Sequence, residues 1–224
     1  MKKVTYTKVD EFFESLTLEE CERYKAYWRT LTPEDYLETF ERWLFAFCSV
    51  HTTWKLNVKG FEAIRPWLKW SQDSAELKNR LTASGVGLQT NRTRYIGQFC
   101  DRYWKAPWDY YKKDSETWVS YRNRLVENIL GLGMAKVSFG IEMIYPCASE
   151  VACLDTHLFK FYGLDQTKHA KQYESIEAHW IDNCKKHQIP SSTIARAIYW
   201  DHQQGQPNSR YWTYVLEKGA QVQT

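Results

Sequence analysis

The sequence lacks the features that mark membrane, secreted and metal-binding proteins. No apolar run approaches the roughly 20 residues that a membrane-spanning helix needs. Residues 1–4 do not resemble a signal peptide, and the six cysteines form no Cys-x-x-Cys pair. The six histidines show no spacing typical of a metal site. We therefore expect a cytoplasmic protein with reduced thiols and without a metal or other cofactor.

The alternation of polar and apolar residues that is typical of strands is also absent, as are repeats, low-complexity tracts and domain linkers. Hydrophobic residues make up 43% of the 224 residues, which is enough for a sizeable core within single-domain range. The net charge of +3 permits nucleic-acid binding without demonstrating it. Eleven Trp and fifteen Tyr indicate a large aromatic core, although some rings could stack on bases. We expect an all-α protein of about ten helices.

A helix start and a buried stripe are evident in the first quarter of the chain. Thr32-Pro33-Glu34-Asp35 is typical of a helix entry, with Thr32 as the N-cap and Pro33 in the first turn. Apolar residues then recur at three-to-four spacing, which predicts a buried face: Tyr36, Leu37, Phe40, Trp43, Leu44, Phe47 and Cys48. The polar triplet His51-Thr52-Thr53 separates this helix from the next, and either threonine could simply cap the following helix.

The chain is organised around residues 129–163. One helix ends at Gly131-Leu132-Gly133 and a second begins at once. Glycine tolerates positive φ and lets another chain approach closely, and the first amides of a helix are unpaired and partly positive, which suits a phosphate. Asp155 then opens a third helix, where a carboxylate is a favoured cap. Taken singly, the glycines predict an ordinary helix end and Asp155 an ordinary N-cap.

Taken together, these features resemble the signature of the helix-hairpin-helix DNA glycosylase superfamily, down to the run Val151-Ala152-Cys153-Leu154-Asp155-Thr156-His157. The resemblance covers residues 33–163 well and the rest weakly. It implies an all-α, two-lobed fold in which residues 1–224 form a single unit. Residues 33–145 would be a central helical lobe that ends in the hairpin at about 126–145, and residues 1–32 and 146–224 would form the second lobe. The cleft between the lobes would hold Asp155. The four-cysteine iron–sulfur loop of many members is absent, because only Cys184 follows Cys153.

The resemblance also implies roles for individual residues. Asp155 would be the catalytic carboxylate, and His51, Thr52 and Thr53 would fill the gap that a flipped base leaves. Residues 89–113 hold six Lys or Arg against two Asp, an excess that favours a phosphate path, with a solvated helix face as the alternative. The expected DNA contacts are Gly131, Gly133, Lys136, Ser138, Lys160, Arg92 and Arg94.

One position departs from the pattern of the bifunctional lyases in this superfamily. These enzymes carry a nucleophilic Lys two residues after the second hairpin glycine, and this position is Ala135 here. Lys136 lies one residue further, about 100° around the helix. A Schiff-base route is therefore disfavoured. Lys136 is left with two alternatives: a phosphate contact, or a catalytic group in a shifted position.

The segments 51–60 and 133–139 resemble a bacteriophage branch of the superfamily, linked to thymidine hypermodification, whose members are amino-acid:DNA transferases. This resemblance implies double-stranded DNA and a free amino acid as partners, and a modified deoxyuridine with a phosphorylated 5-methyl carbon as substrate. Asp155 and Lys136 would be the catalytic residues of a monomer located in the cytoplasm, or in the host cytoplasm if the protein is viral. The alternative is a monofunctional DNA glycosylase that uses Asp155 and water. A second alternative is a DNA-binding protein without catalysis.

Overall fold

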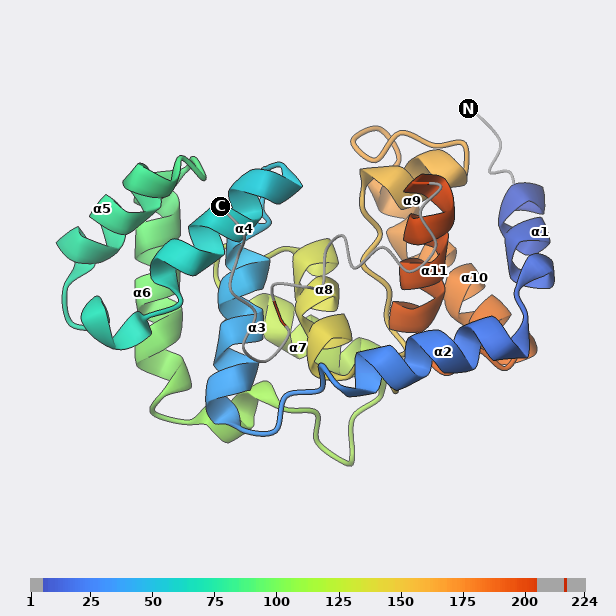
Figure 1. The fold of residues 1–224 in the computed structure, drawn as a ribbon, viewed down its shortest axis with the longest axis horizontal. Coiled ribbons are helices and arrows are strands. Elements are labelled where there is room, and N and C mark those ends of the chain that lie inside the picture. Colours follow the sequence, from blue (N-terminus) through green and yellow to red (C-terminus); the bar gives the residue numbers. More distant parts are fainter. Residues whose placement is uncertain (1–5, 205–215, 217–224) are drawn as a thin grey trace. The chain divides into compact units, whose positions relative to one another are not determined.

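The computed structural model describes residues 6–204 and residue 216 (Figure 1). No strand occurs in this part of the chain, so the all-α prediction is confirmed. None of the described helices is long and apolar enough to cross a membrane. The α-helices are α1 (Thr7–Ser15), α2 (Leu18–Arg29), α3 (Tyr36–Cys48), α4 (Trp54–Ile64), α5 (Ser74–Ser84), α6 (Gln89–Tyr103), α7 (Trp118–Asn128), α8 (Met134–Ile144), α9 (Thr156–Phe161), α10 (Tyr173–Lys186) and α11 (Ser192–Gln204). Short 3₁₀ turns are η1 (Trp67–Lys69), η2 (Pro107–Tyr110) and η3 (Ala170–Gln172).

The chain divides into two compact units. Among the described residues, the central unit comprises residues 33–140, and the terminal unit comprises residues 6–32, 141–204 and 216. Helix α8 contributes residues 134–140 to the central unit and residues 141–144 to the terminal unit.

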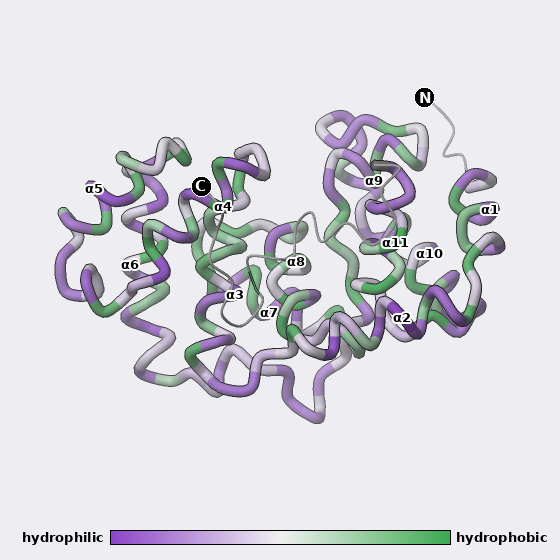
Figure 2. Tube along the Cα trace, viewed as in Figure 1, coloured by the Kyte–Doolittle hydropathy of each residue, from purple (hydrophilic) through white to green (hydrophobic). Residues whose placement is uncertain are grey.

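Helix α3 begins later than the sequence predicts. Asp35 is its N-cap in place of Thr32, and the Asp35 carboxylate accepts a hydrogen bond from the Glu38 N–H at 2.8 Å. Asp is a stronger N-cap than Thr, which accounts for the shift. Tyr36 and Leu37 consequently lie on an exposed part of the first turn, whereas the rest of the predicted stripe is buried. Figure 2 shows the hydrophobic residues along α3.

The core of the central unit is aromatic, as the composition predicts. The rings of Phe40 and Phe99 stack at 5.6 Å between centroids, and Tyr103 packs against both. A Cβ on Gly140 would lie 2.3 Å from the Trp43 ring. A glycine is therefore needed for α8 to pack this closely on α3.

The core of the terminal unit joins the beginning of the chain to its later helices. The Phe13 ring packs edge-on against Trp180 at 4.8 Å, which holds α1 on α10. The Tyr24 hydroxyl donates to the buried Asp201 carboxylate at 2.6 Å and links α2 to α11. Helices α1, α2, α10 and α11 therefore pack together in the unit that also contains Asp155.

Candidate active site

Asp155 is the N-cap of α9 in the terminal unit. Its Oδ1 accepts hydrogen bonds from the N–H groups of His157 at 2.9 Å and Leu158 at 3.0 Å. Its side chain is 31% exposed. The capping role that the sequence predicts is thus present, and it engages only one of the two carboxylate oxygens.

The segment before Asp155, residues 151–155, has no regular secondary structure, and side chains satisfy its backbone instead. Glu177 accepts from the Ala152 N–H at 2.9 Å. The Tyr173 hydroxyl donates to the Ala152 carbonyl at 2.6 Å and accepts from the Leu154 N–H at 3.3 Å. Glu177 and Tyr173 are themselves buried. This buried frame fixes the backbone that presents Asp155.

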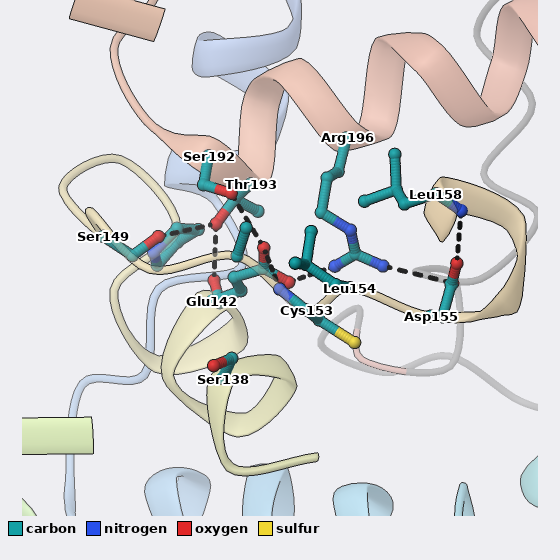
Figure 3. Close-up of polar contacts among 12 residues, drawn as sticks. Ser138, Glu142, Ser149, Cys153, Leu154, Asp155, Leu158, Ser192, Thr193 and Arg196 are labelled. Carbon is teal, nitrogen blue, oxygen red and sulfur yellow. Dashed lines mark hydrogen bonds and ion pairs between the residues drawn. The ribbon is translucent and has the colours of Figure 1, made fainter. Parts of the chain in front are cut away.

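Glu142 and Arg196 extend this frame to the Asp155 carboxylate (Figure 3). Glu142 is fully buried and accepts hydrogen bonds from the Cys153 N–H at 3.1 Å and the Ser192 hydroxyl at 3.0 Å. Its second oxygen, Oε2, pairs with Nη1 of Arg196. Nη2 of Arg196 lies 3.6 Å from Oδ2 of Asp155. The guanidinium therefore bridges two carboxylates, one buried and one partly exposed.

Burial disfavours the charged form of each group in this pair, and the partner's charge favours it. Burial raises the pKa of Glu142 to about 7, against the lowering effect of Arg196. Burial also disfavours the charged form of Arg196, but Glu142 and the neighbouring acidic groups outweigh it and hold its pKa above the ordinary range. Three donors converge on the two oxygens of Glu142 and favour its ionised form against this burial.

The hairpin lies in the central unit. Gly131 has φ +90°, and a Cβ there would lie 2.4 Å from the Tyr95 ring, so this position requires glycine on two grounds. Gly133 is exposed, has no positive φ and has open space around it. The Gly131 part of the prediction is confirmed in its backbone geometry. DNA binding by either glycine remains a prediction.

Lys136 lies in the first turn of α8 and is partly exposed, with its Nζ 5.6 Å from the centroid of the Phe139 ring. Ala135 beside it is also partly exposed. Ser138, by contrast, is fully buried, and its hydroxyl accepts a hydrogen bond from Arg122 at 3.3 Å. The expected DNA contact by Ser138 is therefore wrong, because its side chain faces the core of the central unit.

Arg92 also differs from its expected role. Only 3% of it is exposed, and its guanidinium donates to two sets of main-chain carbonyls. One set of acceptors lies at the C-terminal end of α3 and just after it, and the other precedes α6: Phe47, Cys48, Val50, Val86 and Gly87. Arg92 is therefore a structural clamp and cannot contact DNA in this conformation. Arg94 and Lys160 are exposed, as a phosphate contact requires.

The loop that Arg92 holds carries the predicted wedge residues. His51 is exposed and has φ +47°, a left-handed conformation that is uncommon outside glycine. Thr53 is the N-cap of α4, which is the alternative role that the sequence left open. Thr52 is partly exposed between them, and among the described residues its buried hydroxyl oxygen has no hydrogen-bond partner. In the loop before α6, Leu88 is 46% exposed and has φ +52°.

The sequence motifs do not anticipate Glu142 or Arg196. Glu142 and Arg196 are 54 positions apart, and no local pattern connects them.

The chain matches no protein-family model and no curated protein sequence. Three solved structures share its fold. The 8-oxoguanine DNA glycosylase of Methanocaldococcus jannaschii has a TM-score of 0.68 at 18% identity and covers 90% of this chain and 94% of its own. The 8-oxoguanine DNA glycosylase of Thermotoga maritima has a TM-score of 0.68 at 14% identity, over 92% of this chain and 100% of its own. The third is the Methanocaldococcus jannaschii 8-oxoguanine glycosylase/lyase in complex with a 15mer DNA containing 8-oxoguanine. It has a TM-score of 0.67 at 18% identity, over 91% and 98% of the two chains. The predicted helix-hairpin-helix DNA glycosylase-like fold is confirmed.

Proposed function

We propose that this protein flips a thymine-type base out of duplex DNA and transfers an amino acid to the activated 5-methyl carbon of that base. The amine nitrogen would attack the methylene carbon, and the C–O bond to phosphate or pyrophosphate would break, with the electron pair leaving on the phosphate oxygen. Asp155 would take the proton that the amine loses. A base is accessible to such chemistry only after it leaves the stack.

The observation that carries the proposal is that the two carboxylate oxygens of Asp155 have different partners. Oδ1 is engaged by the two N–H groups at the start of α9, whereas Oδ2 lies beside a guanidinium in a side chain that is 31% exposed. A carboxylate with one oxygen beside a guanidinium and a partly exposed side chain can accept a proton or stabilise positive charge in a substrate.

The hairpin supports a reaction without a Schiff base. Ala135 stands where a lyase would need Lys, and an alanine cannot act as a nucleophile. In this proposal Lys136 contacts DNA phosphate or the departing phosphate. The exposed Arg94 and Lys160 contact the DNA backbone, together with Gly131 and Gly133, and the exposed ring of His51 enters the duplex next to Thr52.

A monofunctional DNA glycosylase is the second candidate, and the observation that favours it is the fold. All three structural neighbours are 8-oxoguanine glycosylases by their descriptions, and one holds DNA. A fold alone does not fix the chemistry of a site. Asp155 with water would serve that reaction, and Ala135 is equally compatible with it.

The deciding experiment supplies duplex DNA containing 5-phosphomethyl- or 5-pyrophosphomethyl-deoxyuridine together with a mixture of amino acids. The DNA is digested and its nucleosides are weighed by mass spectrometry, with an 8-oxoguanine duplex in parallel. A transferase gives an intact nucleoside that has gained an amino acid and lost the phosphate. Abasic sites and free base without any adduct would refute the transferase and leave the glycosylase.

Borohydride reduction in the presence of each DNA tests the absence of the lyase route. We expect no covalent protein–DNA complex, because Ala135 has no amine. A trapped complex that disappears in Lys136→Ala would instead assign the nucleophile to Lys136.

A further inference from the structure

The buried pair of Glu142 and Arg196 is unusual for a helical core. Glu142 is 0% exposed and the Arg196 side chain 10% exposed. Taking two charges out of water costs free energy that their mutual attraction often fails to recover, so stability alone is a weak reason for such a pair. The third charged group, Asp155, lies at the partly exposed end of the same row.

We propose that Arg196 is a positioning residue for Asp155 and that Glu142 holds Arg196 in place. This inference rests on the catalytic role proposed for Asp155. Nη1 of Arg196 is tied to Glu142, which leaves Nη2 directed at Oδ2 of Asp155 at 3.6 Å. With Oδ1 fixed by the His157 and Leu158 N–H groups, the carboxylate is restrained at both oxygens. Its rotation about χ2 is limited, and Oδ2 faces one direction.

Glu142 connects this restraint to the backbone. The carboxylate that anchors Arg196 also accepts from the Cys153 N–H, two residues before Asp155. It accepts from Ser192 at the start of α11, the helix that carries Arg196. One buried carboxylate therefore sets the main chain before Asp155 and the side chain that faces it. Orientation of this kind is what a reacting group needs, since a misplacement of about 1 Å can cost about 100-fold in rate.

A double-mutant cycle on turnover tests the proposal. Arg196→Met, Asp155→Asn and the double variant are compared in the nucleoside assay, with DNA affinity measured by fluorescence anisotropy. We expect Arg196→Met to lower kcat by about 100-fold with KM for DNA unchanged. The double variant should be no slower than Asp155→Asn, because Arg196 acts through Asp155. Losses that multiply, or full kcat in Arg196→Met, would overturn the proposal.

Two conservative variants keep the test decisive if Arg196→Met does not fold. Arg196→Lys retains the charge but lacks the planar fork that directs one nitrogen to each carboxylate, and Glu142→Gln retains the shape without the charge. Each should lower kcat while leaving KM unchanged. Lys185→Met is the matched control, since it removes an exposed Lys185–Glu150 ion pair of the same unit and should leave kcat unchanged.

Amide hydrogen exchange separates this inference from the proposed function. The amides of His157 and Leu158 report the hold on Asp155 directly. In Arg196→Met, or in Arg196→Lys if the former does not fold, they should exchange about fivefold faster than in Lys185→Met. The Ala152 amide, bonded to Glu177, should keep its rate. If the wild type yields neither adduct nor abasic DNA, the proposed function fails, and exchange still decides the positioning. Unchanged exchange at His157 and Leu158 would overturn the positioning even in an active enzyme.

Discussion

Replacement of Asp155 by Asn separates the two tasks of this carboxylate. Oδ1 accepts from the His157 and Leu158 N–H groups at 2.9 and 3.0 Å, and Asn retains an acceptor oxygen that caps a helix about as well. The lost charge faces Arg196 at 3.6 Å, an interaction that contributes about 0.2–1 kcal/mol at a partly exposed site. Asp155→Asn should therefore lower the free energy of unfolding by about 1 kcal/mol or less, which is at most about 2–4 °C in Tm for a chain of this length.

Asp155→Asn should have a much larger effect on turnover than on stability. Loss of a group that transfers a proton in the transition state costs about 10²- to 10⁴-fold. Asp155→Ala should be equally inactive and should lose about 1 kcal/mol more stability, because it removes the cap as well. Thermal unfolding followed by circular dichroism gives the stabilities, and the nucleoside assay gives the rates.

Asp73 provides a matched control. It caps α5 with the same geometry, since its Oδ1 accepts from the N–H groups two and three residues later at 2.9 and 3.0 Å. Asp73→Asn should change Tm as little as Asp155→Asn does and should keep full turnover. Full turnover in Asp155→Asn would refute the catalytic role. A Tm of Asp155→Asn as low as that of Asp155→Ala would refute the capping geometry on which the estimate rests.

Three further predictions follow from single side chains. Lys136→Ala should reduce the magnitude of the slope of log affinity for DNA against log salt concentration by about one. An unchanged slope in a salt titration followed by anisotropy would exclude a phosphate contact by Lys136. Arg92→Met should lower the free energy of unfolding by about 3 kcal/mol or more, because it leaves several buried carbonyls without a donor. Arg94→Ala should leave Tm unchanged within error and weaken DNA binding. Equal Tm values for the two variants would contradict the structural role of Arg92. Hydrogen bonds from Arg124 hold the pKa of Glu116 down to about 2. Glu116 therefore stabilises the fold above its unfolded pKa of about 4.3, and this stabilisation is lost as pH falls through 2. Glu116→Gln should have a lower Tm than wild type at pH 7 and the same Tm near pH 2.

The features that the sequence predicts correctly are those with local causes. Three-to-four spacing of apolar residues makes α3 helical, and Asp155 caps α9 because its own side chain reaches amides two and three residues away. Gly131 has positive φ for a reason that lies in its own turn. The misassigned start of α3 is also local, since two acceptable caps lie three residues apart and the stronger one is used.

The errors share a different cause. The expected DNA contacts of Arg92 and Ser138 rest on the family resemblance and on the excess of basic residues at 89–113, but the partners of both side chains come from elsewhere in the fold. Three of the carbonyls that Arg92 binds lie 42 to 45 positions earlier in the chain, and the donor to Ser138 lies 16 positions earlier. A buried arginine is recognisable only when the acceptors around it are known.

The contrast between local and distant contacts also explains why the sequence predicts only part of the site. The sequence around Asp155 predicts its position at the start of a helix. Its surroundings, however, come from α8, α10 and α11, each of which contributes one buried polar side chain: Glu142, Glu177 and Arg196. Such groups lower stability unless every partner is present. A segment that needed only to connect α8 to α9 could be built from apolar contacts, so the polar frame around residues 151–155 is best explained by the need to hold a charged group in one orientation. On this argument the polar frame fixes the backbone before Asp155 and, through Arg196, the Oδ2 oxygen that the proposed function assigns to proton transfer, while Oδ1 caps α9.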